Sequence, residues 1–324
     1  MASGDTGSAP VPPPGPDGLG PRIAVALDRV QRSRRPLALA VAVARKGAED
    51  GIGALCAGLT YYGFMGLFPL LLVLVTVLGY VLAGNPGLQQ RILDSALADF
   101  PVIGIQLRDN VTSLRGSGLA LAVGVLVAAY GGLRVGRAGQ DAMARVWGVP
   151  RTERGSLLVR TARGVGLLGA LGAAILAGAA LDWLVARNAA FGAPVRVAAV
   201  GARLVVDLAI FSIVFRVLTA RPLGWRAVLP GAAVATVGWE ALQSVGALYV
   251  TRVLAQMSPT YGAFALVIGL LLWIALQCRV LLYAAEVNVV LVERLWPRSL
   301  VGSPTAGDIR ARALRAAGVG AAPG

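Results

Sequence analysis

The sequence of 324 residues contains no histidine, one lysine (Lys46) and only two cysteines, Cys56 and Cys278. Without histidine, the chain cannot build a His-ligated metal site, a Ser-His-Asp catalytic triad or a histidine proton relay. Two cysteines within or beside apolar segments are too few for a disulfide framework or a four-cysteine zinc site, and we expect them to be packing residues. We therefore expect no metal, no cofactor and no catalytic residues, and hence no enzyme.

Charge is scarce as well. Charged residues make up 14% of the sequence and hydrophobic residues 56%, whereas an ordinary soluble domain has about 25% charged and about 45–50% apolar residues. The mean hydropathy is +0.71. A soluble protein of this length would need more charge to cover its surface, so the composition predicts an integral membrane protein.

The charges that are present are mostly positive, because 30 Lys and Arg face 16 Asp and Glu and give a net charge of +14. In a soluble protein this excess would point to a nucleic acid partner. Here the basic residues lie between apolar segments, where they favour contact with anionic lipid at the cytoplasmic face. We expect that lipid contact and no nucleic acid partner, and a homo-oligomer is compatible with the sequence.

Composition also divides the chain into three parts. Residues 1–35 begin with a run of Gly, Pro and Ser and end in a basic stretch, which predicts a disordered tail and not a signal peptide. Residues 299–324 have a similar composition and predict a second disordered tail. The membrane domain should occupy 36–298, beginning with a short interfacial helix at 37–46.

Six apolar segments in this domain are close to or above the ~20 residues that a helix needs to cross a bilayer. They form an all-α polytopic bundle in our prediction. Pro69 lies in the first segment and should kink it. The second segment should continue as an amphipathic arm to about residue 147, and two short amphipathic pieces at 87–99 and 101–114 should cap the outer face. The six segments are 53–82, 117–133, 164–184, 198–218, 227–250 and 262–292.

The distribution of basic residues predicts the orientation of the bundle. Twenty-two of the 30 Lys and Arg residues fall before the first segment, in alternate loops or after the last segment, and seven fall in the other loops. The positive-inside rule then places both termini in the cytoplasm, and an even number of spans agrees with this. We therefore expect a multi-pass protein of the bacterial plasma membrane.

Ionisable and polar groups inside the spans are candidate functional residues, because a charge at the bilayer centre costs at least ~2.5–3.5 kcal/mol. Asp207 lies one turn after Arg203 in the fourth span, and Glu240 lies in the middle of the fifth with Gln243 one turn later. The rise per residue places Asp207 and Glu240 at similar depths. They could pair with other groups to fix the bundle, or they could line a path for a substrate.

Four further residues leave the same choice open. Glu286, near the end of the last span, could anchor the helix at the inner interface or belong to such a path, and Arg279 precedes it by two turns. Tyr61 and Tyr62 lie in the first span before Pro69 and need hydrogen-bond partners at that depth. They could bond across helices or face a cavity next to the kink.

Three groups of motifs follow one another along the chain. They are GLTYY at 58–62 with LFPLL at 67–71, FR at 215–216 with WR at 225–226 and PGA at 230–232, and YG at 261–262 with LW at 272–273 and AEVN at 285–288. In this order they resemble the YihY/BrkB family of membrane proteins: the first group resembles the family's opening ALAYY and SLFPLL, and the last resembles its GAELN ending. Gly66 stands where a serine is usual, and Arg279 stands where an apolar residue is expected.

The resemblance runs in order over about 40–295 and implies a six-span inner-membrane protein. The family was once named ribonuclease BN, a name now regarded as mistaken, and its members are linked to serum resistance and suspected of transport. We expect a transporter or exporter of a small or amphiphilic, lipid-like substrate. The alternative is a membrane scaffold or envelope-assembly factor that transports nothing, whose contacts would lie in the outer loop and the basic cytoplasmic arms.

Overall fold

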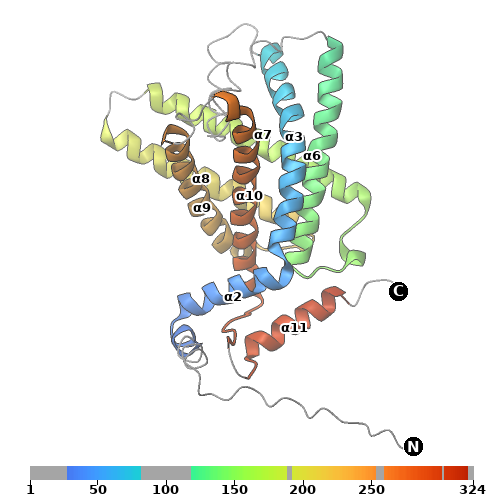
Figure 1. The fold of residues 1–324 in the computed structure, drawn as a ribbon, viewed down its shortest axis with the longest axis vertical. Coiled ribbons are helices and arrows are strands. Elements are labelled where there is room, and N and C mark those ends of the chain that lie inside the picture. The colour runs from blue at the N-terminus through green and yellow to red at the C-terminus, as the bar shows by residue number, and fades with distance from the viewer. Residues whose placement is uncertain (1–27, 82–117, 188–191, 253–258, 301–302, 320–324) are drawn as a thin grey trace, which may run out of the picture.

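The computed structural model describes residues 28–81, 118–187, 192–252, 259–300 and 303–319. Its regular structure in these ranges is helical, and no strand occurs among them, so the all-α prediction is confirmed (Figure 1). The elements are α2 (Arg35–Asp50), α3 (Ile52–Val81), α6 (Gly118–Val146), the short 3-10 turn η1 (Arg151–Glu153), α7 (Leu157–Arg187), α8 (Ala193–Leu218), α9 (Trp225–Arg252), α10 (Pro259–Val292) and α11 (Ala306–Val319).

Each of the six predicted apolar segments lies within or largely within one long helix, in order α3, α6, α7, α8, α9 and α10. Helix α6 runs unbroken to Val146, as expected for the amphipathic arm. Helix α3 continues through Pro69, whose kink stays a prediction. The expected amphipathic pieces at 87–99 and 101–114 lie outside the described residues.

Two described segments are long and apolar enough to cross a membrane. They are Val197–Leu218 and Val267–Val292, with mean hydropathies of 2.1 and 2.0, and Ile52–Leu67 is a shorter apolar helix. These two segments indicate a membrane protein. The crossing of all six helices is a proposal to which we return below.

The long helices are neighbours in the order of the chain. Each of α3, α6, α7, α8 and α9 packs against the next, and α10 packs against both α9 and α3, so the six helices close on themselves (Figure 1). Helix α6 also touches α8 and α10 across the bundle. The short connections between α7 and α8, α8 and α9, and α9 and α10 favour packing of these consecutive helices against each other.

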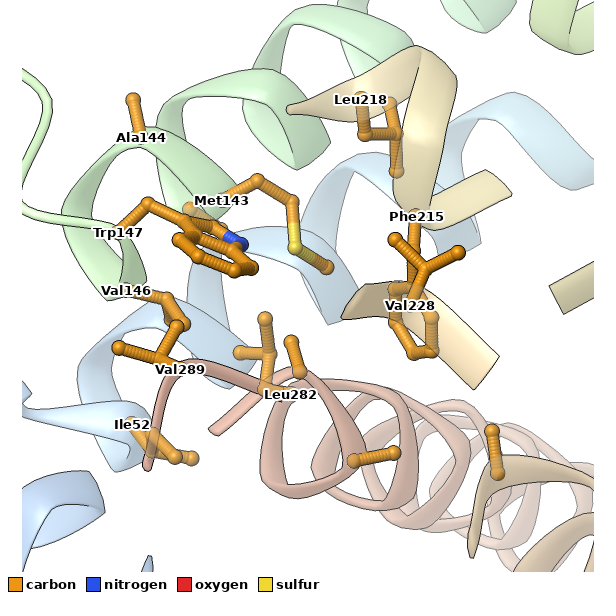
Figure 2. Close-up of a cluster of buried hydrophobic side chains, with 14 of the residues drawn as sticks. Ile52, Met143, Ala144, Val146, Trp147, Phe215, Leu218, Val228, Leu282 and Val289 are labelled. Carbon is orange, nitrogen blue, oxygen red and sulfur yellow. The ribbon is translucent and has the colours of Figure 1, made fainter. Parts of the chain in front are cut away.

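The buried apolar core lies toward one end of the bundle. It gathers the last turns of α6, α8 and α10 and the first turns of α3 and α9, where the largest fully buried side chains include Trp147, Met143 and Phe215 (Figure 2). Dense packing of this kind is stabilised by many small dispersion contacts. This end of the bundle therefore holds the helices in fixed positions.

Helix α2 lies across that end of the bundle (Figure 1). Pro36 in its first turn needs no backbone hydrogen bond, and Gly51 ends it with φ +71°, a left-handed conformation that glycine adopts without strain. Ala38, Ala42 and Lys46 recur every fourth residue and are all buried. The expected interfacial helix thus exists, and its buried stripe is packed against the bundle.

The ends of the described chain are more ordered than we expected. Residues 28–33 are helical, and the segment 303–319 contains α11, which lies beside α2 below the bundle (Figure 1). Ala311 of α11 is buried, and Leu314 packs against the core near Gly148. The structure therefore differs from the prediction of disordered tails at 28–35 and 306–319, whereas residues 1–27 and 320–324 lie outside the described residues.

Helix α11 begins with a reciprocal cap that the sequence signals. The Asp308 carboxylate accepts a hydrogen bond from the Thr305 backbone N–H at 2.9 Å, and the Thr305 hydroxyl accepts one from the Asp308 N–H at 3.3 Å. Thr305 and Asp308 are three residues apart, as in a capping box with aspartate in place of glutamate. The Gly and Ala content of the segment concealed this start signal.

Arg298 ties this cap to the rest of the chain. Its buried guanidinium donates to Asp308 Oδ1 at 2.8 Å and to Glu49 Oε1 of α2 at 2.5 Å, and its carbonyl oxygen accepts a bond from Gln31 Nε2 at 2.6 Å. Asp28 accepts a bond from the Leu300 backbone N–H at 2.8 Å. We call Asp28, Gln31, Glu49, Arg298 and Asp308 the terminal clamp.

The terminal clamp predicts a defined acid sensitivity. Burial alone would raise the pKa of Asp308, but hydrogen bonds from the Thr305 and Ser299 N–H groups, the Thr305 hydroxyl and Arg298 lower it from 3.8 to about 2. A lowered pKa stabilises the fold above the unfolded value, and this contribution is lost as the pH falls from about 4 to about 2. We expect Asp308→Asn to cost about 2 kcal/mol of unfolding free energy at neutral pH.

The measurement is thermal unfolding of the wild-type protein and D308N in detergent between pH 2 and pH 7. The difference between the two should be constant above about pH 4 and should disappear near pH 2. A difference that persists unchanged to pH 2 would show that Asp308 acts without its charge.

Candidate functional site

The candidate residues on α8 and α9 are joined by an ion pair between the two helices. Arg203 Nε lies 3.2 Å from Glu240 Oε1, and 47% of the Arg203 side chain and 34% of the Glu240 side chain are exposed. The pair sits above an edge-to-face contact of Phe211 with Trp239, whose ring centroids are 6.1 Å apart. Sequence analysis placed the two helices at matching depths but did not foresee that Arg203 pairs with Glu240.

Asp207 and Gln243 flank this pair. Asp207 lies one turn after Arg203 on α8, Gln243 lies one turn after Glu240 on α9, and both side chains are half-buried. Charged and polar groups at this level of two apolar helices are costly in lipid, and they are usually found facing a protein interior or a water-filled cavity. We refer to Arg203, Asp207, Glu240 and Gln243 as the mid-helix polar group.

Tyr61 and Tyr62 lie on a different pair of helices. Their rings meet edge-to-face with centroids 5.3 Å apart, Tyr61 is 59% exposed, and Tyr62 is half-buried. Arg134 of α6 lies near Tyr62 and donates a 2.5 Å hydrogen bond to the Tyr130 hydroxyl. Arg134 thus lies close to these tyrosines between α3 and α6. The four-residue spacing of Tyr130 and Arg134 is the sequence signal that could have identified this contact.

Glu286 is fully buried and does not anchor α10 at a lipid–water surface. Its Oε2 atom lies 3.1 Å from Lys46 Nζ of α2, and Lys46 Nζ also lies 2.5 Å from Asp50 Oδ2. The third contact of the ammonium is a 2.8 Å hydrogen bond to the Val146 carbonyl oxygen in the last turn of α6. Lys46 therefore joins α2, α6 and α10, and we call this set the lysine cluster.

Three features of the lysine cluster follow from elementary rules. An α-helix leaves its last carbonyl groups without intrahelical partners, and a cation near them is favourable because of the helix dipole. The spacing of Lys46 and Asp50 by four residues allows a pair on one helix. Sequence analysis treated Lys46 only as the basic end of an interfacial helix, and the fact that it is the only lysine in the chain was the unused signal.

Exposure differs along the face of α10 that carries Arg279, Tyr283 and Glu286. Arg279 and Tyr283 are exposed, and Glu286 is buried because α2 crosses α10 there, with Gly47 directly against the Tyr283 ring. Arg279 forms no ion pair within the described ranges. This face of α10 thus divides into a part covered by α2 and a part that α2 leaves open.

Two of the sequence motifs meet beside the lysine cluster. The Gly231 backbone N–H donates a 2.6 Å hydrogen bond to Asn288 Oδ1, both residues being buried. A Cβ atom on Gly231 would collide with the Ala284 carbonyl oxygen and the Asn288 amide. Only glycine permits this approach of α9 to α10, next to the interruption that Pro230 makes in the hydrogen bonds of α9.

Within the part of the chain that the structure describes, no group of three or more Cys, Asp, Glu or His residues could hold a metal ion. The two cysteines are a buried Cys56 and a half-buried Cys278, both unbridged.

The lysine cluster predicts a large effect of removing its cation. Lys46→Met would leave the Asp50 and Glu286 carboxylates buried without their counter-charge, and breaking a buried pair in this way costs about 3–5 kcal/mol. Neighbouring Arg45 is the control, because it is 41% exposed and pairs with Glu49 at 3.6 Å, so that Arg45→Met should cost about 0–1 kcal/mol. Unfolding in mixed detergent micelles measures both, and equal losses would contradict this role for Lys46.

Comparisons with known proteins match the chain to a family and to a curated protein. A family model described as "Virulence factor BrkB" matches residues 43–306. A ribonuclease-like protein of Bacillus subtilis (strain 168), YfkH, is 32% identical over 94 residues, which are 29% of this chain and 34% of that protein. The chain thus spans about a third of the length of this curated relative. No solved structure matches the chain.

Proposed function

Since the chain belongs to the virulence factor BrkB family of membrane proteins, we propose that it is a six-span protein of the bacterial plasma membrane that moves a small or amphiphilic, lipid-like substrate. The mid-helix polar group on α8 and α9 would line the path. Both termini, α2 and α11 would lie in the cytoplasm.

The six-span proposal is supported by the six long helices, each of which packs against the next along the chain. The orientation is supported by the 22 basic residues assigned to the cytoplasmic side against seven on the other side. The connection between α6 and α7 then faces the cytoplasm, and the start of α8 faces outward.

Cysteine labelling tests this topology. In a background with Cys56→Ala and Cys278→Ala, Ser156→Cys reports on the α6–α7 connection and Pro194→Cys on the first turn of α8, both positions being exposed. We expect a membrane-impermeant maleimide to label P194C in intact cells and S156C only after the membrane is permeabilised. Labelling of S156C in intact cells would reverse the proposed orientation.

The observation that carries the transport proposal is the Arg203–Glu240 pair. Protein leaves 47% of the Arg203 side chain and 34% of the Glu240 side chain uncovered. Charges in contact with lipid at mid-depth are costly, so these groups are expected to face a water-filled path. The lysine cluster is enclosed by protein, and opening it would cost about 3–5 kcal/mol, so the path is better placed at the mid-helix polar group than between α2 and α10.

The same reasoning assigns different roles to the other candidates. Glu286 would hold the cytoplasmic end of the bundle together and would not line the path. Tyr61 and Tyr62, accompanied by Arg134, would offer aromatic and cationic groups between α3 and α6 to the polar end of an amphiphile.

The ribonuclease-like name describes the Bacillus subtilis relative, which matches over 94 residues. Nuclease chemistry requires a metal held by several carboxylates or a histidine acid–base pair. The chain contains no histidine. We propose no nuclease activity for it.

Removing the charges of the mid-helix polar group tests the transport proposal. We expect a lipid or metabolite that co-purifies with the wild-type protein in native-lipid nanodiscs to be lost from the Glu240→Gln, Asp207→Asn double variant, because its polar contacts are gone. Mass spectrometry of the bound molecules measures this.

The chain offers a matched control. Arg221 and Glu293 form a pair of the same length, 3.2 Å, with 37% and 33% of the side chains exposed, just beyond the ends of α8 and α10. Glu293→Gln should retain the co-purifying molecule. If all three proteins carried only the bulk lipid of the membrane, the transport proposal would lose its support and the scaffold alternative would gain it.

A further inference from the structure

A basic pocket lies where α6, α7 and the segment after α8 meet, at the same end of the bundle as α2. Its lining includes Arg154, Arg160 and Arg163, together with Asp141 and Gln140 of α6. The pocket is a shallow hollow, with an enclosed volume of only about 10 Å³ and the rest open to the solvent, so that a ligand would lie across its mouth. Three guanidinium groups and one carboxylate give this lining a formal charge of +2.

Two of the arginines are held in place. Asp141 Oδ1 lies 2.8 Å from Arg160 Nη2 and 3.3 Å from Arg154 Nη1, and Arg154 Nε donates to the Val149 carbonyl oxygen at 3.3 Å. Only 19% of the Arg160 side chain and 22% of the Arg154 side chain are exposed. Asp141 therefore positions two cations that are already largely removed from water, which lowers the ordering cost of binding an anion.

The pocket retains unused donors. An arginine carries five N–H groups in a planar fork that matches carboxylate and phosphate oxygens. The hydrogen bonds above use two N–H groups of Arg154 and one of Arg160. Arg163 forms no hydrogen bond or ion pair within the described ranges. The three arginines thus carry more positive charge than Asp141 neutralises, and this excess favours the binding of an anion.

The first turn of α7 carries two exposed leucines close in sequence to the arginines of this pocket. Leu157 and Leu158 come just before Arg160 and are 71% and 83% exposed. Leucines in this position, next to arginines, are characteristic of a membrane interface, where apolar side chains enter the acyl region and cations meet the headgroups. A ligand with both an anionic and an apolar part fits this arrangement.

We propose that Arg154, Arg160 and Arg163 bind the phosphate of a phospholipid headgroup, with an acyl chain along Leu157 and Leu158. The cytoplasmic leaflet presents such anionic groups to basic residues at the membrane surface. The proposal rests on the membrane character of the family and on this pocket, and it holds whether or not the protein transports a substrate.

Titration calorimetry of the delipidated full-length protein in a non-ionic detergent tests the site. The probes are dihexanoylphosphatidic acid, which carries a phosphate and two short chains, and inorganic phosphate, which carries no chain. We expect Arg163→Gln to weaken binding of the lipid about tenfold, as expected for losing one charge-assisted hydrogen bond. Arg163→Lys should retain part of the affinity, because it keeps the charge without the planar fork.

Two further variants test whether the pocket is the binding site and whether the acyl chain contributes to binding. Arg151 is exposed in the same connection but does not line the pocket, so Arg151→Gln should bind the lipid within about twofold of the wild-type protein. Leu157→Ser should weaken binding of the lipid and leave inorganic phosphate unaffected. Melting temperatures equal to that of the wild-type protein establish that the variants are folded.

The outcomes decide the proposal and are separate from the transport test. Equal weakening by R163Q and R151Q would mean that the overall positive charge attracts the lipid, and the pocket would not be its site. Inorganic phosphate binding as tightly as the lipid, with L157S unchanged, would make the site one for free phosphate and overturn the lipid assignment. The co-purification result for the E240Q, D207N double variant bears on neither outcome.

Discussion

The contacts of Lys46 hold together the end of the bundle on which the rest of the structure depends. One ammonium group is shared by a carboxylate on its own helix, a carboxylate on α10 and the last-turn carbonyl of α6. Each partner would be costly to bury alone, and together they fix three helices in one arrangement. The apolar core of Figure 2 lies at the same end of the bundle, and the terminal clamp joins α2 to α11 through Arg298.

The bundle therefore combines two kinds of ionic contact with different consequences. Pairs at the core end are buried and hydrogen-bonded, and they resist separation. The pair between α8 and α9 is about one-third to one-half exposed. In the transport proposal, the core end would hold the helices while the region of this pair opens. The last turn of α8 and the first turns of α9 belong to the core, so a separation of these two helices would be confined to the part away from it.

Sequence reasoning predicted much of the fold because its signals are local. Apolar length identified the six long helices, and the continuation of α6 followed from its amphipathic pattern. The partners of Lys46 and Arg203 could not be predicted, because they depend on which helix faces meet, and no local pattern specifies that. Glu286 was recognised as unusual, but its burial follows from the crossing of α2. The helical order of the tails was not predicted, because the low-complexity composition concealed the capping signal at Thr305 and Asp308.

The terminal clamp also constrains how the protein is made. Gln31 bonds to a carbonyl group 267 residues further along the chain, and Lys46 bonds to one 100 residues further along. During translation, the N-terminal residues of these contacts are synthesised before the C-terminal ones. Lys46 can therefore reach its buried contacts only after α6 and α10 have been synthesised. Completion of the chain is thus coupled to closure of this end of the bundle, because a product truncated before Arg298 would lack the contacts that join α2 to α11.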